Sequence, residues 1–181
     1  MISIKEVKQA ANLIKGKVIR TPLVYSPSLS HMFGGEIYLK LENLQKTGSF
    51  KIRGATYSIL KNKDEIGPGG VVAASAGNHA QGVALAARQA LIPVTIVMPE
   101  CVSISKQEAT RGYGGEVVIA GRTLGESIKE AEEIVKDGKT FIHPFDDPDI
   151  IAGQGTVALE ILDDLKEIDM ILAPIGGGGF I

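Results

Sequence analysis

From residue 70 onward, short apolar runs alternate with longer segments of helical periodicity. The runs VVAAS, VTIVM, EVVIA and TFI are rich in β-branched residues and predict strands at residues 71–75, 94–98, 116–120 and 140–142. Between them, apolar residues at helical spacing predict helices at residues 78–89, 105–113 and 123–136. Such alternation indicates an α/β domain, with a parallel sheet, right-handed crossovers and helices on both faces.

Several helix starts carry capping signals. A hydroxyl residue followed three positions later by Glu is a capping box, and a proline favours the first helical turn. These signals occur at Ser3 with Glu6, Ser26 with Pro27, Ser105 with Glu108, and Thr123 with Glu126.

The flanking segments have other patterns. Residues 36–42, EIYLKLE, alternate as a strand, residues 150–165 predict a helix, and the apolar run MILAP, residues 170–174, predicts a buried strand. Only Ile175, a glycine run and two apolar residues follow it, so we expect more of the same sheet beyond Ile181. We therefore expect three parts: residues 1–50 and 149–181 from an incomplete large domain, and residues 51–148 as a small α/β domain.

Composition and charge narrow the class of partner. The 181 residues are 44% hydrophobic and 22% charged, which fits a folded domain with a sizeable core. A net charge of -2, from 19 basic and 21 acidic residues, gives no footprint for nucleic acid or an anionic membrane, so we expect a small-molecule partner. The N-terminus lacks a signal-peptide pattern and Cys101 is the single cysteine, which together favour the cytoplasm.

One lysine has unusual neighbours. In KTGSFKIRGA, residues 46–55, two glycines and two small hydroxyl residues surround Lys51. A lysine needed only for solubility requires no such setting, whereas a lysine that forms a covalent bond needs a fixed position and a lowered pKa. Lys51 is therefore the candidate reactive residue.

A polar turn follows the first predicted strand of the alternating unit. In SAGNHAQG, Ala76 and Gly77 would let a ligand approach the backbone, while Asn78, His79 and Gln81 offer polar groups at a helix N-terminus. Ligands of parallel sheets bind at this end of the strands. The alternative is an ordinary N-cap, since Asn is a preferred capping residue.

The second candidate turn is the run of Gly176, Gly177, Gly178 and Gly179. Successive residues without Cβ can direct several backbone N–H groups at one anion, as in phosphate sites. A flexible linker is the alternative, but the position directly after an apolar run favours a phosphate loop. A lysine, an Asn turn and a phosphate loop together fit a ligand with a carbonyl, a hydroxyl and a phosphate. Pyridoxal phosphate has all three.

Other patterns carry less weight. Gly153, Gly155 and Ala158 match the dinucleotide pattern G-x-G-x-x-A, but they lie in a predicted helix rather than after a strand. Ser103 with Lys106 is an isolated S-x-x-K. His31, His79 and His143 are too scattered in sequence to indicate a metal site, and the aspartates of FDDPD indicate a solvated turn with a helix N-cap.

KTGSFKIRGA, SAGNHAQG, PFDDPDIIAGQGT and PIGGGG, in this order, resemble the fold-type-II pyridoxal-phosphate enzymes, in the branch of threonine dehydratases and serine racemases. The resemblance implies a tryptophan synthase β-like α/β fold and pyridoxal 5'-phosphate as cofactor. It implies these roles: Lys51 as the catalytic lysine that binds the cofactor, Phe50 beside its ring, Asn78 on its hydroxyl, Gly176, Gly177, Gly178 and Gly179 on its phosphate, and Ser75, Ala76, Gly77, Asn78 and His79 toward the substrate.

The resemblance also implies a reaction: dehydration and deamination of L-threonine, and of L-serine, to a 2-oxo acid and ammonia by a homo-oligomer. Racemases of this family carry serine at the position of Ala76, and an alanine methyl has no proton to transfer, so a dehydratase is favoured. A serine racemase-like enzyme remains an alternative, as does a non-catalytic folding or binding unit. The residue that would bind the ring nitrogen is expected beyond Ile181.

Overall fold

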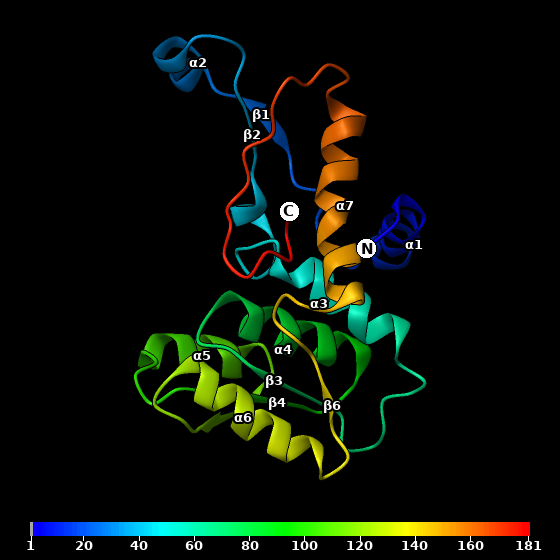
Figure 1. The fold of residues 1–181 in the computed structure, drawn as a ribbon, viewed down its shortest axis with the longest axis vertical. Helices are drawn as coiled ribbons and strands as arrows, with labels where there is room; N and C mark the ends of the chain where they lie inside the picture. The colour runs from blue at the N-terminus through cyan, green and yellow to red at the C-terminus, as the bar shows by residue number, and fades with distance from the viewer. Residues whose placement is uncertain (1) are drawn as a thin grey trace.

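The four predicted strands of the alternating unit form one parallel sheet in the computed structural model, which describes residues 2–181 (Figure 1). They are β3 (Val71–Ala74), β4 (Val94–Met98), β5 (Glu116–Ile119) and β6 (Thr140–Phe141). Their order across the sheet is β5-β4-β3-β6. The chain therefore grows outward from β3 to β5 and then returns to the opposite side of β3, which confirms the predicted α/β class.

Helices cover both faces of this sheet (Figure 1). Val71 and Ala73 of β3 pack in one apolar cluster with α4 (Asn78–Ala90), while Val72 and Ala74 pack in another with α6 (Leu124–Val135). Successive residues of a strand face opposite sides, so a strand covered on both faces must be apolar throughout. That requirement explains the uninterrupted apolar runs. The edge strand β5 packs against α5 (Ile104–Gly112).

The remaining elements lie outside the sheet. Two short strands pair antiparallel. The longest helix, α7, starts at Pro148, two residues before the predicted start at residue 150. Its N-cap is Asp147, one of the aspartates expected to form a turn with an N-cap, and Asp147 Oδ1 accepts bonds from Asp149 N and Ile150 N at 2.9 Å. These elements are α1 (Ile4–Ile14), β1 (Leu23–Tyr25), α2 (Pro27–Phe33), β2 (Tyr38–Lys40), η1 (Glu42–Leu44), α3 (Lys51–Lys61) and α7 (Pro148–Asp164).

Helix α3, which the sequence pattern did not predict, connects the two parts of the molecule. It packs against α4 on one side and against α7 and α1 on the other. Glycines allow the close approach: a Cβ at Gly82 of α4 would lie 3.1 Å from the Lys51 carbonyl carbon, and a Cβ at Gly153 of α7 would lie 2.6 Å from the Cα of Gly54. Gly153 thus serves helix packing, consistent with the rejection of the dinucleotide pattern.

A buried ion-pair network also fixes α3. The guanidinium of Arg53, 1% exposed, binds Glu42 Oε1 at 2.8 Å and Glu160 Oε1 at 2.7 Å, and Lys40 Nζ binds Glu160 Oε2 at 2.6 Å. Burial by itself lowers the pKa of Arg53, but the hydrogen bonds and charges of the two glutamates outweigh it and raise the pKa. The network joins η1, β2 and α7 to the helix that begins at Lys51.

The prediction of a strand at residues 170–174 is wrong for this structure. Those residues are extended coil, with Leu172 89% exposed and Met170 75% exposed. Within residues 2–181, none of the strands pairs with them, and a strand exists only by pairing. The strand predicted at residues 36–42 is shortened to β2.

Capping differs from the prediction at two helices. Helix α1 has the complete capping box of Ser3 and Glu6. Helix α5 begins at Ile104, so Ser105 lies inside it, and the side chain of its N-cap residue, Ser103, makes no capping hydrogen bond. At α6, Thr123 Oγ1 accepts from Glu126 N at 3.2 Å, whereas Glu126 accepts from the N–H of Arg122, one residue earlier than expected. The hydroxyl half of this box is confirmed.

Candidate active site

The candidate site lies where the strand order reverses. β3 has β4 on one side and β6, the last strand in sequence, on the other, so the segments leaving β3 and β6 diverge at their carboxyl ends. In open α/β sheets this is the position at which ligands bind. The turn after β3 is SAGNH, and the segment after β6 is Ile142 to Asp147. Both therefore face the place where the fold favours a ligand.

Lys51 reaches this place from the first residue of α3. Its Nζ donates a 2.6 Å hydrogen bond to the carbonyl oxygen of Pro144, three residues beyond β6. The side chain is half-buried, and this desolvation lowers the pKa of Lys51 below its ordinary value of 10.5. A lysine with a lowered pKa provides more of the neutral amine, which is the form that attacks a carbonyl.

The turn after β3 places its residues in different environments. Gly77 is the N-cap of α4, so Asn78 is its first helical residue, and its exposed side chain makes no capping bond. The ordinary N-cap interpretation of Asn78 is therefore wrong, and its amide is free for another partner. Ala76 and Gly77 are half-buried, and the Ser75 hydroxyl accepts from Gly77 N at 3.1 Å.

His79 is the most enclosed of the predicted site residues, at 3% exposed. Its Nε2 lies 3.0 Å from the carbonyl oxygen of Ile142, so this nitrogen carries the proton and donates. Burial lowers the pKa of His79 to about 4, with smaller contributions from the Lys51 and His143 charges, and the ring is neutral at pH 7. The geometry shows His79 binding the segment that also binds Lys51.

The glycine run rests on Phe145. A Cβ at Gly177 would collide with the Phe145 ring, and a Cβ at Gly179 would collide with the Phe145 carbonyl. Gly178, at φ +86°, occupies the left-handed region that favours glycine. A run that packs this closely against a neighbour is not a free linker, and its role as a phosphate loop stays a prediction.

Phe50 lies against the residue that follows the glycine run. The rings of Phe50 and Phe180 stack with centroids 4.0 Å apart and an interplanar angle of 17°. Lys51 Nζ lies 5.6 Å from the Phe50 centroid. The predicted residues Phe50, Lys51 and the glycine run are thus brought to one place, although they are more than 120 residues apart in sequence.

Several buried polar atoms near this place have no hydrogen-bond partner among residues 2–181. They are the hydroxyls of Thr47 and Ser49, on either side of Gly48 in the lysine motif, and Nδ1 of His79. Buried polar groups are normally paired, so unpaired ones indicate room for a polar ligand. A half-buried lysine, a glycine loop and the unpaired hydroxyls of Thr47 and Ser49 fit a cofactor that carries a carbonyl and a phosphate, and the unprotonated Nδ1 of His79 is an acceptor without a partner. The surface depression of about 530 Å³ between α1 and α7 has none of the predicted site residues in its wall.

Sequence reasoning missed three contributors. A main-chain acceptor such as the Pro144 carbonyl leaves no sequence signal, since any residue supplies it. Phe145 had a weak signal, because Phe141, His143 and Phe145 alternate as one face of an extended segment. The third contributor is Phe180, the residue immediately after the glycine run.

Residues 14–181 match the family described as pyridoxal-phosphate dependent enzyme, so this chain belongs to that family. The fold-type-II architecture and the cofactor expected from the motifs are thereby confirmed.

The chain is 53% identical to the L-threonine ammonia-lyase of Thermotoga maritima, covering 100% of this chain and 45% of that protein. Among solved structures, it superposes on maize serine racemase with a TM-score of 0.95 and 39% identity, over 99% of this chain and 55% of that one. For the processed form of threonine deaminase isoform 2 from Solanum lycopersicum the values are 0.88 and 41%, over 98% and 51%. The chain therefore spans about half the length of the relatives it matches. Within residues 2–181, none of the helices has the length and apolar character to cross a bilayer.

Proposed function

We propose that the protein of which this chain forms part dehydrates and deaminates L-threonine, and L-serine as a second substrate, with pyridoxal phosphate as cofactor. The observation that carries the proposal is Lys51, half-buried at the point where the strand order reverses and held on Pro144. Identity of 53% to a threonine ammonia-lyase supports the reaction class.

In this proposal the bound cofactor stores the electrons released from the substrate Cα. The residues of the chain bind and orient. Lys51 would hold the cofactor covalently until the substrate amine displaces it, and the freed Lys51 amine, in its neutral form, would then take the Cα proton at Nζ. Asn78 donates to the cofactor hydroxyl, and the N–H groups of Gly176 to Gly179 bind the phosphate. Phe50 packs beside the cofactor ring.

The remaining predicted residues act on the substrate. Ser75, Ala76 and Gly77, with Asn78, lie at the N-terminal end of α4, where backbone N–H groups and the helix dipole favour a carboxylate. His79 was also predicted to face the substrate, but it is 3% exposed and its Nε2 binds Ile142 O, so in this proposal it acts indirectly, by holding the segment that binds Lys51. A homo-oligomeric state and a cytoplasmic location stay predictions from sequence.

The test is Lys51→Ala in the full-length protein, with Lys46→Ala as the matched control. Lys46 is an exposed lysine of the same motif, bound to the Lys17 carbonyl. We expect Lys51→Ala to lose the visible absorbance of lysine-bound cofactor and nearly all formation of 2-oxobutanoate, while Lys46→Ala keeps both. Borohydride reduction followed by peptide mass spectrometry should label Lys51. Labelling of another lysine would refute the assignment.

A second candidate is serine racemisation, which the TM-score of 0.95 to maize serine racemase favours. Ala76 argues against it, because a racemase needs a proton donor on each face of the substrate Cα, and a methyl group supplies none. Ala76→Ser should raise the ratio of serine racemisation to deamination. Chiral chromatography of the wild-type products would decide: racemisation as fast as deamination contradicts the dehydratase proposal.

A further inference from the structure

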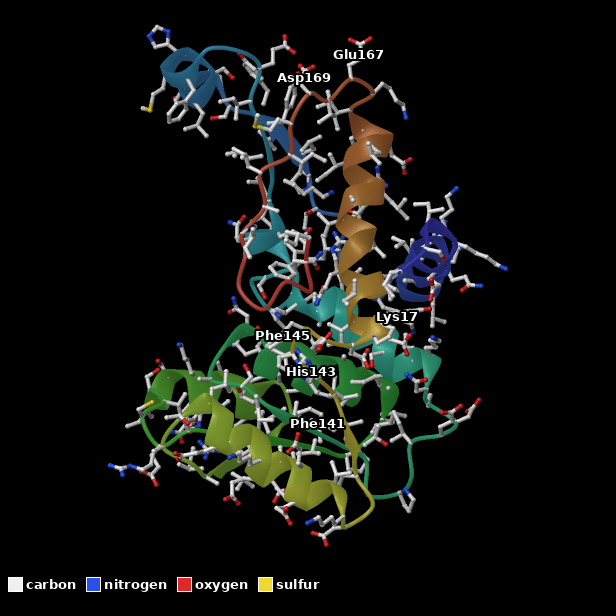
Figure 2. The ribbon with its side chains drawn as sticks, in the orientation of Figure 1. Lys17, Phe141, His143, Phe145, Glu167 and Asp169 are labelled. Carbon is white, nitrogen blue, oxygen red and sulfur yellow. The ribbon has the colours of Figure 1, made fainter. Side chains whose placement is uncertain are left out.

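Three aromatic side chains follow one another along β6 and its extension. Phe141 and His143 have ring centroids 6.0 Å apart, and His143 and Phe145 have centroids 4.8 Å apart, with interplanar angles of 77° and 83°. Figure 2 shows them in succession, with Phe145 nearest the C-terminal segment. Residues two apart in an extended chain share a face, which explains the row.

The backbone at Phe145 is also fixed. His143 Nδ1 accepts hydrogen bonds from Phe145 N at 3.2 Å and from Asp146 N at 2.7 Å. The carbonyls before it are held as well, since Ile142 O accepts from His79 and Pro144 O from Lys51. A ring on so constrained a backbone provides a rigid surface.

The glycine run uses this surface on one side and an aromatic stack on the other. Gly177 lies on the Phe145 ring and Gly179 on the Phe145 carbonyl, while Phe180 stacks on Phe50. Phe145 directly follows the carbonyl that binds Lys51, and Phe50 directly precedes Lys51. The contacts therefore form a closed cycle. Lys51 binds Pro144, the next residue Phe145 contacts the glycine run, and Phe180 after the glycine run stacks on Phe50, the residue before Lys51.

We propose that Phe145 and Phe180 are positioning residues that hold the glycine run at a fixed distance from Lys51, so that its N–H groups are in place for the cofactor phosphate. The proposal rests on the proposed site, in which Lys51 and the glycines bind the two ends of one cofactor. Four glycines in succession have high conformational entropy, and without these contacts the loop would lose that entropy on binding. Contacts with the two rings restrict the loop when the protein folds, so the loop loses less conformational entropy when the phosphate binds.

The test compares pyridoxal phosphate with pyridoxal, which lacks the phosphate, by absorbance titration of the full-length protein freed of cofactor. The variants are Phe145→Leu and Phe180→Leu, which keep an apolar side chain but remove the flat ring. We expect each to weaken pyridoxal phosphate binding about tenfold and pyridoxal binding less than about twofold, because only the phosphate uses the ordered loop.

Phe141→Leu is the matched control. Phe141 belongs to the same aromatic row and is half-buried against the α6 side of the sheet, but it does not touch the glycines. We expect a lower melting temperature and an unchanged ratio of the two affinities. A general loss of stability would move both affinities together, so the ratio separates positioning from folding.

Each outcome decides a different point. An unchanged ratio in Phe145→Leu and Phe180→Leu, or an equal change in Phe141→Leu, overturns the positioning role and leaves the proposed function standing. A wild-type protein that binds pyridoxal as tightly as pyridoxal phosphate overturns it too, since the glycine run then binds no phosphate. Absence of Lys51-dependent binding of either compound overturns both proposals.

Discussion

Two five-residue apolar segments of this chain lie in opposite environments, one buried and one exposed to solvent. VTIVM forms β4, in which all five residues are buried, whereas MILAP, residues 170–174, is extended and exposed. β4 has β3 and β5 on its two edges and helices on both faces. MILAP pairs with none of the strands within residues 2–181. The difference shows that β-propensity describes how well a residue packs on a pleated, half-buried sheet. A segment of that composition forms a strand only where neighbouring strands supply the rest of the sheet.

The strongest test of this comparison places a charge in each segment. In the 181-residue chain, Val97→Asp introduces an unpaired carboxylate at a side chain that is 0% exposed, and Leu172→Asp introduces one at a side chain that is 89% exposed. We expect Val97→Asp to cost more than about 4 kcal/mol, enough to unfold the sheet, and Leu172→Asp to change stability by less than about 0.5 kcal/mol. Urea unfolding followed by circular dichroism measures both. A large loss in Leu172→Asp would show that MILAP is packed.

A third region, around α3, is held by charge rather than by a sheet. Arg53→Met leaves the half-buried Glu42 without an ion-pair partner and Glu160 with only Lys40, so we expect a loss of about 3–5 kcal/mol in the free energy of unfolding. Arg111→Met removes the exposed pair with Glu108 and should cost under about 1 kcal/mol. Equal losses in the two variants would show that the network contributes no more than a surface pair.

The glycines provide a smaller test of close packing. Gly153→Ala places a methyl group 2.6 Å from Gly54 Cα, so the crossing of α3 and α7 must open, and we expect a loss of about 1–3 kcal/mol. Gly125→Ala in α6 meets nothing closer than 3.9 Å and should stabilise the helix by up to about 1 kcal/mol. Melting temperatures compare the two. Gains in both would mean that the helices have room to separate.

The smallest expected effect is a pH dependence at Glu160. Burial by itself raises the pKa of Glu160, but hydrogen bonds from Arg53 and Lys40 outweigh it, and the pKa lies below its ordinary value of 4.5. A depressed pKa gives stability that is present above pH 4.5 and is lost as the pH falls through the folded-state pKa. Glu160→Gln should therefore flatten the loss of stability below pH 4.5. Urea midpoints between pH 7 and pH 3 measure this, and an unchanged slope would assign the acid sensitivity to other carboxylates.

Much of the sheet was predictable because burial on both faces requires continuous apolar runs, as in β3 and β4. Helix α3 was not, since its buried face includes Arg53, Thr56 and Ser58, which a search for apolar periodicity does not count. MILAP was predicted wrongly because its apolar composition does not determine whether another strand pairs with it.

In the candidate site too, some residues were predictable from local sequence and others were not. Lys51, Asn78 and the glycine run stand in motifs that name their chemistry, and the structure brings Lys51 and the glycines together. The Pro144 carbonyl and the Glu42–Arg53–Glu160 network depend on contacts between residues 11 to 107 positions apart. Local sequence contains no information about such pairs.

At Gly54 and Gly153, α3 and α7 touch backbone to backbone, so no side chain can yield between them. Helix α7 continues for 11 residues beyond Gly153, to Asp164, a lever of about 16 Å at 1.5 Å per residue. Tilting that lever by about 10° about the crossing would move its far end by about 3 Å, by the same helix geometry. Arg20 binds Asp164 at that far end, which anchors the lever against the N-terminal segment. The orientation of the helix that begins at Lys51 is thereby linked to an exposed salt bridge at the far end of α7.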